Sequence, residues 1–180
     1  MKPWVVRKST ALLKRHWMEL REDLVSLVEG GEEFEFHIVE LPTWVAVVAL
    51  TDDRKLLFVD QYRHASQLVS RELPAGVIEP DETPLAAAKR ELLEETGYVA
   101  AEWSPLIELL PEPSKVKTRA HFFFARGARR VAEQNPDATE QIHVVPVDAE
   151  AWMDEVTSGR MQHGVHLAAL LFAVQRGLLP

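Results

Sequence analysis

The stretch from Gly76 to Tyr98 constrains the fold most, because it joins the start and stop signals of a helix to a dense group of acidic side chains. Thr83 is a suitable N-cap, and Pro84 suits the first helical turn. Gly97 is well placed to end the helix, because glycine adopts the left-handed conformation that follows many helices. We therefore expect a helix between Thr83 and Gly97.

Three glutamates, Glu91, Glu94 and Glu95, fall within five positions near the end of this expected helix. Residues spaced i, i+3 and i+4 share a face, so their side chains lie within an arc of roughly 100°. The opposite face is expected to pack through an apolar stripe of three residues: Leu85, Ala88 and Leu92.

Like charges at this density repel one another, and two interpretations of the acidic face remain open. It is either a solvated surface, since glutamate is a good helix former, or a site for a divalent cation. Carboxylate oxygens suit Mg²⁺, and Mn²⁺ as well. Arg90 can reach Glu94 at i+4 and orient its carboxylate.

Composition narrows the classes of protein that remain. The formal net charge of −8 argues against non-specific binding to nucleic acid or to an anionic membrane. The chain has no cysteine, which excludes disulfides and thiolate metal sites and permits a reducing compartment. No apolar run is long enough to span a bilayer, and no signal peptide is evident at the start. We expect a cytoplasmic protein.

Hydrophobic patterning divides the chain into two parts. Residues 1–42 are rich in β-like alternation, as in the segment 33–38, and predict an antiparallel β segment. Residues 43–180 contain apolar runs typical of central strands, including a hairpin around the turn "TDDR", and close with two helices. Several strands with few helices indicate an α+β fold, in the form of an α/β/α sandwich.

The spacing of the acidic stretch resembles the Nudix box, G-x5-E-x7-R-E-U-x-E-E-x-G-U, where U is a large aliphatic residue. Tyr98 is the one departure, at the final aliphatic position. The motifs "QYR" and "ELPAG" are similar to the ADP-ribose pyrophosphatase branch of the Nudix hydrolases, and this likeness covers nearly the whole chain. The residues that match the box, which spans 76–98, are Gly76, Glu82, Arg90, Glu91, Leu92, Glu94, Glu95 and Gly97.

The resemblance implies the Nudix fold and a metal centre that binds Mg²⁺, with Mn²⁺ as an alternative. Its implied ligands are the carboxylates of Glu91 and Glu95 and the carbonyl of Ala75, with Glu94 as a further ligand or a partner through water. Arg90, with Glu82, is expected to hold the loop and helix in register as a supporting member of the catalytic set.

Three residues are candidates for substrate binding, each with a structural alternative. Arg63 could clamp a phosphate, because guanidinium offers a charge-assisted fork, or could form a surface ion pair. Glu72 could accept a hydrogen bond from a sugar hydroxyl or pair with Arg71. Trp44, or an aromatic residue within 17–36, could stack on a base, with an ordinary core aromatic as the alternative.

The catalytic base is the least defined member of the site. Many relatives carry an acidic residue in the loop after the box, where this chain has Thr118 and Arg119. Glu140, just before a late strand, is the best substitute and Glu112 a weaker one. Glu94 is counted with the catalytic residues as well as with the ligands.

The resemblance therefore implies Mg²⁺-dependent hydrolysis of a nucleoside diphosphate sugar, such as ADP-ribose or GDP-mannose, to a nucleoside monophosphate and a sugar phosphate. Alternatives are a dinucleotide or nucleoside triphosphate pyrophosphatase, and a ligand-sensing module that does not hydrolyse. Residues 1–42 are expected to form a homodimer, with neither nucleic acid nor membrane as partner. His163 and His166 are interpreted as polar positions at a helix start.

Overall fold

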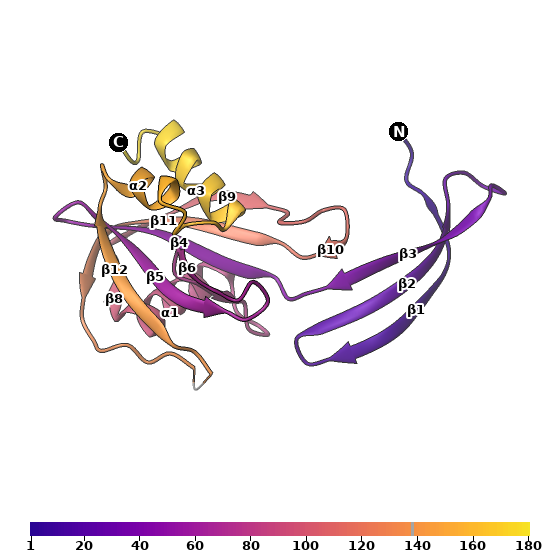
Figure 1. The fold of residues 1–180 in the computed structure, drawn as a ribbon, viewed down its shortest axis with the longest axis horizontal. Coiled ribbons are helices and arrows are strands. Elements are labelled where there is room, and N and C mark those ends of the chain that lie inside the picture. Colours follow the sequence, from indigo (N-terminus) through magenta and orange to yellow (C-terminus); the bar gives the residue numbers. More distant parts are fainter. Residues whose placement is uncertain (138) are drawn as a thin grey trace. The chain divides into compact units, whose positions relative to one another are not determined.

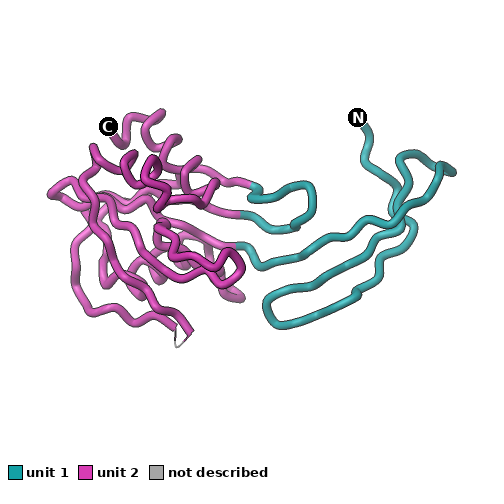
Figure 2. The backbone as a smooth tube through the Cα atoms, in the orientation of Figure 1, with its two compact units in different colours: residues 1–43, 110–119 teal, residues 44–109, 120–180 magenta. Residues whose placement is uncertain are grey.

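The computed structural model describes residues 1–137 and 139–180, which form two compact units (Figure 2). Unit 1 comprises residues 1–43 and 110–119, and unit 2 comprises residues 44–109 and 120–180. The first boundary lies within one residue of the expected one. The segment 110–119 corrects the expected division, because its strand hydrogen-bonds to the N-terminal β segment rather than to the second part of the chain.

Unit 1 is a four-stranded sheet in the order β1-β2-β3-β10. The first three strands form the antiparallel meander that the alternation predicts, and β10 adds a short parallel edge. Val25 is the one hydrophobic residue described in this unit that is buried. The strands are β1 (Val5–Arg15), β2 (Met18–Ser26), β3 (Glu33–Glu40) and β10 (Val116–Lys117).

Unit 2 is built on a mixed sheet whose central strands are β5, β4 and β11 (Figure 1). The predicted hairpin is present as the antiparallel pair β4–β5, while β11 lies parallel to β4 on its other side. The strands are β4 (Trp44–Thr51), β5 (Lys55–Arg63), β6 (Leu68–Glu72), β7 (Ala75–Val77), β8 (Tyr98–Val99), β9 (Glu102–Leu109), β11 (Ala120–Arg130) and β12 (Ile142–Asp148).

Alternate residues of β4 face two separate cores, because successive side chains of a strand point to opposite faces. Val45 and Val47 pack with helix α1, whereas Ala46 and Val48 pack with the two C-terminal helices. Helices on both faces of one sheet confirm the predicted α/β/α sandwich. Within the described residues, none of the helices has the length and apolar character to cross a membrane. The helices are α1 (Pro84–Thr96), α2 (Trp152–Thr157) and α3 (Gly164–Gln175).

Helix α1 begins and ends as its sequence predicts. The Thr83 side chain accepts a hydrogen bond from the Ala86 N–H, and Gly97 adopts φ 76° and closes the helix. Its buried face corrects one expectation. Leu85 is 37% exposed, while Ala87 takes the inward position beside Ala88 and Leu92.

Candidate active site

Two glutamates of α1 lie against the loop that enters it. Glu95 is 1% exposed, and its Oε2 accepts a hydrogen bond of 2.9 Å from the backbone N–H of Ala75. Glu91 faces Gly76 so closely that a Cβ on residue 76 would fall 2.0 Å from Glu91 Oε1. The solvated-face interpretation therefore fails for these two carboxylates, since the side chain of Glu91 is only 13% exposed.

Arg90 ties the loop to the helix through both ends of its guanidinium group. Its Nε and Nη2 donate to the two oxygens of Glu82, each at 3.0 Å, and Nη2 also donates to the carbonyl of Val77 at 3.0 Å. Its Nη1 donates to Glu91 at 2.8 Å and to Glu94 at 3.0 Å. Three carboxylates share one guanidinium, which lowers the pKa of Glu82 and orients the other two.

The two inward-facing carboxylates of the site, those of Glu91 and Glu95, are costly to ionise. Burial raises the pKa of Glu91 to about 7, against the opposing hydrogen bond from Arg90. Burial also raises the pKa of Glu95 well above its ordinary value, and the negative charges of Glu91 and Glu140 add to the effect. Oxygen donors that repel one another in a buried position suit a hard divalent cation such as Mg²⁺. The donor set therefore fits the metal centre that the sequence predicts.

Arg63 and Glu72 form a two-pronged ion pair beside this centre. Arg63 Nε donates to Glu72 Oε1 at 3.0 Å and Nη2 donates to Oε2 at 2.6 Å. Glu72 is 1% exposed, whereas the Arg63 side chain is 44% exposed. Burial acts to raise the pKa of Glu72, but the hydrogen bonds and charge of Arg63 outweigh it and hold this pKa below its usual range.

The alternative pairing of Glu72 with Arg71 is wrong. Adjacent residues of a strand point to opposite faces, and Arg71 instead binds Asp60 through Nε at 2.8 Å and Nη2 at 2.7 Å. Its Nη1 donates to Glu155 at 2.5 Å and so connects the sheet to α2.

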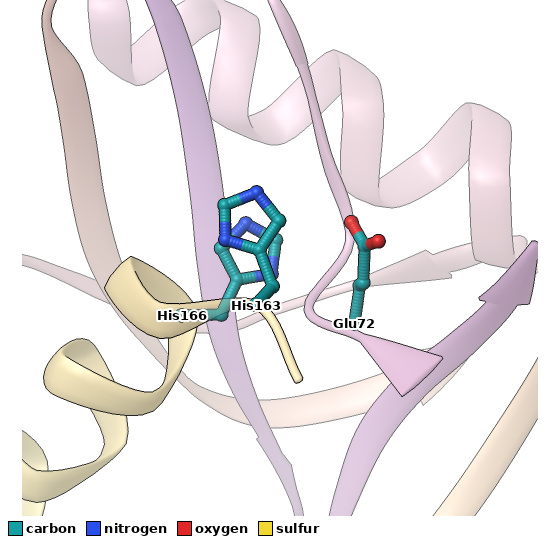
Figure 3. A group of neighbouring side chains, drawn as sticks. All are labelled: Glu72, His163 and His166. Carbon is teal, nitrogen blue, oxygen red and sulfur yellow. The ribbon is translucent and has the colours of Figure 1, made fainter. Parts of the chain in front are cut away.

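Trp44, His163 and His166 form a group of packed rings next to Glu72. The half-buried Trp44 makes an edge contact with Phe122, with ring centroids 5.7 Å apart, and also lies against both imidazoles. Its role in substrate binding stays a prediction. The rings of His163 and His166 stack, with centroids 3.9 Å apart, and Glu72 lies beside them (Figure 3).

Both histidines lie at the start of a helix, as expected, since His163 is the residue before α3 and His166 is in its first turn. The expectation that His166 is a polar surface position is wrong, because His166 is 1% exposed. Its imidazole Nδ1 accepts a hydrogen bond from the Leu73 N–H at 3.1 Å. The spacing of His166 with Ala169, Leu170 and Ala173 is the signal that could have revealed this, since i, i+3, i+4 and i+7 define one buried helix face.

The candidates for the base lie in different places. Glu140 is exposed on the segment before β12 and binds the N–H of Asp137, and its charge acts on Glu91 and Glu95. Glu112 belongs to unit 1, where it binds Ser114. Thr118, where the resemblance led us to expect an acidic residue, donates to the Pro42 carbonyl at 2.6 Å.

A mixed sheet between helical layers, with the carboxylates of Glu91 and Glu95 on helix α1 turned toward the loop before it, indicates the class of this protein. The family model of the NUDIX domain matches residues 41–163, so the chain belongs to the Nudix family. It is a Nudix hydrolase by fold and by its relatives.

Two curated relatives cover most of the chain. A "methanol dehydrogenase activator" of Bacillus methanolicus is 29% identical over 168 residues, 93% of this chain and 89% of that protein. An "ADP-ribose pyrophosphatase" of Bacillus subtilis (strain 168) is 32% identical over 147 residues, 81% of this chain and 77% of that protein. A crystal structure of an "ADP compounds hydrolase" shares the fold with a TM-score of 0.85 at 19% identity, over 97% of this chain and 94% of that chain.

Proposed function

We propose that this protein hydrolyses the diphosphate bond of a nucleoside diphosphate sugar, with ADP-ribose as the leading substrate, in a reaction that depends on Mg²⁺. The products are a nucleoside monophosphate and a sugar phosphate. The observation that carries the proposal is the geometry of Glu91 and Glu95, whose carboxylates lie against the loop at Ala75 and Gly76 and offer a set of oxygen donors that suits a divalent cation. The Bacillus subtilis relative supports the choice of substrate.

We assign a role to each site residue from its position. Glu91 and Glu95 would hold the cation, with Glu94 at the more exposed rim, 39% exposed, and the Ala75 carbonyl on the loop side. Bound Mg²⁺ would neutralise the diphosphate and lower the pKa of the attacking water. Arg63 uses its Nε and Nη2 edge for Glu72, and we assign its Nη1 edge to a substrate phosphate.

Proton transfer is assigned to Glu140, which is exposed and whose negative charge acts on Glu91 and Glu95. A carboxylate near the attacking water can accept its proton as the bond to phosphorus forms. The position of Arg63 supports binding of the diphosphate, and Glu72, whose two oxygens both accept hydrogen bonds from Arg63, would orient that arginine.

A substrate panel tests the proposal. ADP-ribose, GDP-mannose, ADP-glucose, UDP-glucose, NAD⁺, NADH, diadenosine polyphosphates and dGTP would be incubated with and without Mg²⁺, and products would be separated by chromatography. We expect metal-dependent release of a nucleoside monophosphate from a nucleotide sugar, and its loss in Glu95→Gln. Tight binding without hydrolysis of any member would instead favour the ligand-sensing module.

We also propose that residues 1–42 form a homodimer interface. A sheet with a single buried hydrophobic residue lacks the core that an independent sheet needs. Several large apolar side chains of unit 1 are exposed, among them Val6, Leu12, Trp17, Leu27 and Val28. Light scattering after size exclusion should give twice the mass of one chain, and a monomeric mass would contradict the interface.

We also propose a cytoplasmic location, because a chain without cysteine tolerates a reducing compartment.

A further inference from the structure

One buried hydrogen bond joins the end of β6 to helix α3, two parts that lie far apart in the sequence. The Leu73 N–H donates to His166 Nδ1 at 3.1 Å. Because Nδ1 accepts, the neutral imidazole carries its proton on Nε2. Burial lowers the pKa of His166 well below its ordinary value, which keeps the ring neutral and Nδ1 able to accept.

The surrounding side chains do not form a second metal site, although Glu72, His163 and His166 offer ligand atoms within 4.8 Å of one another. The two imidazole planes are only 14° apart and stacked (Figure 3). A cation lies in the plane of an imidazole ligand, about 2.0 Å from its nitrogen, so two stacked rings cannot share one. Both oxygens of Glu72 are already bound to Arg63.

The segment that His166 contacts connects the two halves of the active site. At one end Glu72 holds Arg63, and two residues beyond Leu73 the Ala75 N–H binds Glu95. Leu73 lies between them and is itself completely buried. A change in the path of the backbone at Leu73 would therefore move both Glu72, which holds Arg63, and Ala75, which binds Glu95.

The ring that holds Leu73 is fixed by its own neighbours. His163 stacks on His166, and Phe122 makes an edge contact with it at 5.9 Å between centroids. Trp44 lies against it at 5.5 Å. These contacts set the direction of Nδ1, which an aliphatic residue of equal size could not reproduce.

We propose that His166 is a positioning residue of the active site, which acts by accepting the Leu73 N–H and so fixes the segment that carries Glu72 and Ala75. This inference rests on the proposed function in one respect, the role of Glu95 as a metal ligand. In this role His166 acts through the backbone N–H of Leu73.

A matched pair of variants tests it. His166→Asn keeps an acceptor, because the amide Oδ1 takes the place of Nδ1, whereas His166→Leu keeps the bulk and removes the acceptor. The readout is Mn²⁺ binding to the full chain, measured by calorimetry without substrate. We expect His166→Leu to bind Mn²⁺ about tenfold more weakly or worse, as for loss of other residues that orient metal ligands. His166→Asn should bind within about threefold of the wild type, since it preserves the hydrogen bond.

Unchanged Mn²⁺ affinity in folded His166→Leu would overturn the inference, and so would equal losses in both variants. Thermal melting verifies folding. If His166→Leu does not fold, NMR of the wild type tests the inference through the tautomer of His166 and the exchange rates of the backbone amides. An Nε2–H tautomer with slow exchange of the Leu73 and Ala75 amides supports the inference, and an Nδ1–H tautomer or a rapidly exchanging Leu73 amide overturns it. A wild type that binds Mn²⁺ but hydrolyses no panel member would refute the proposed function alone, because the binding comparison still stands.

Discussion

The carboxylate of Glu91 occupies the space where a side chain of residue 76 would stand. A Cβ built on Gly76 would fall 2.0 Å from Glu91 Oε1 and 2.1 Å from its Cδ. The backbone of Gly76 does not require glycine for its φ angle, since its φ is not in the left-handed range. Its lack of a side chain is instead what lets the loop and a buried carboxylate meet.

Gly76→Ala should therefore impair the site more than the fold. Glu91 Oε1 is the end of a flexible side chain and can move aside, so we expect a small change in melting temperature. The displaced carboxylate should reduce Mg²⁺-dependent activity by about tenfold to a hundredfold, the usual cost of a disturbed ligand shell. Steady-state kinetics across Mg²⁺ concentrations measures this. Gly164→Ala is the control, because a Cβ there meets no atom within 4 Å, and equal losses in both variants would contradict the explanation.

Mg²⁺ should stabilise the wild type against thermal unfolding, and Glu95→Gln should abolish most of that gain. A ligand that binds only the folded state stabilises it by about 2.7 kcal/mol at one hundred times its dissociation constant. The substitution also replaces a buried carboxyl group, whose pKa is raised by burial, with a neutral amide. The metal-free variant should therefore be at least as stable as the metal-free wild type. Melting curves with Mg²⁺ and with a chelator test both statements. Exposed Glu102→Gln is the control, and a full Mg²⁺ response in Glu95→Gln would refute the assignment of this ligand.

Arg90→Lys should cost about tenfold in activity or more, because an ammonium cannot bind Glu82 with two prongs and reach Glu91 at the same time. Glu82→Gln should weaken the same network. In a double-mutant cycle the double variant should lose less activity than the sum of the losses of the two single variants. The reason is that each single substitution already breaks the same connection. Arg176→Lys is the control, because Arg176 is exposed and its Nη1 donates to the Pro105 carbonyl at 3.2 Å. Additive losses would show that the two residues act independently.

Glu155→Gln should destabilise the protein in a way that depends on pH. Hydrogen bonds from Arg160 and Arg71 hold the pKa of Glu155 below its ordinary 4.5 despite its burial. A lowered folded-state pKa means that the stabilisation is complete above the unfolded-state pKa and is lost as the pH falls through the folded-state pKa.

Urea unfolding of wild type and Glu155→Gln should therefore differ by about 1 kcal/mol at pH 7. The difference should shrink as the pH is lowered below 4.5, the ordinary pKa of Glu155. A difference that stays constant down to pH 3 would show that the charge of Glu155 is not responsible. Glu150→Gln, at an exposed ion pair with Arg54, provides the comparison.

Local sequence predicted helix α1 and its ends, because capping and chain reversal depend on a few adjacent residues. Thr83 and Gly97 act as their residue types predict. The spacing of the box residues likewise predicted that Arg90 reaches Glu94, since i and i+4 adjoin on any helix. The predicted burial of Leu85 was wrong, because the face that packs against the sheet runs through Ala87 and not through Leu85.

The sequence by itself determined the family, the α/β/α class and the residues of the acidic helix, because these depend on short-range spacing. Tertiary structure alone decided that Glu72 pairs with Arg63 rather than Arg71, that β10 joins the N-terminal sheet, and that His166 is buried against Leu73. Each of these contacts joins segments whose proximity depends on how strands are ordered and which face of each strand is buried. The physical reason is that hydrogen bonds and burial act between neighbours in space, and neighbours in space across a sheet are not encoded in any one stretch of sequence.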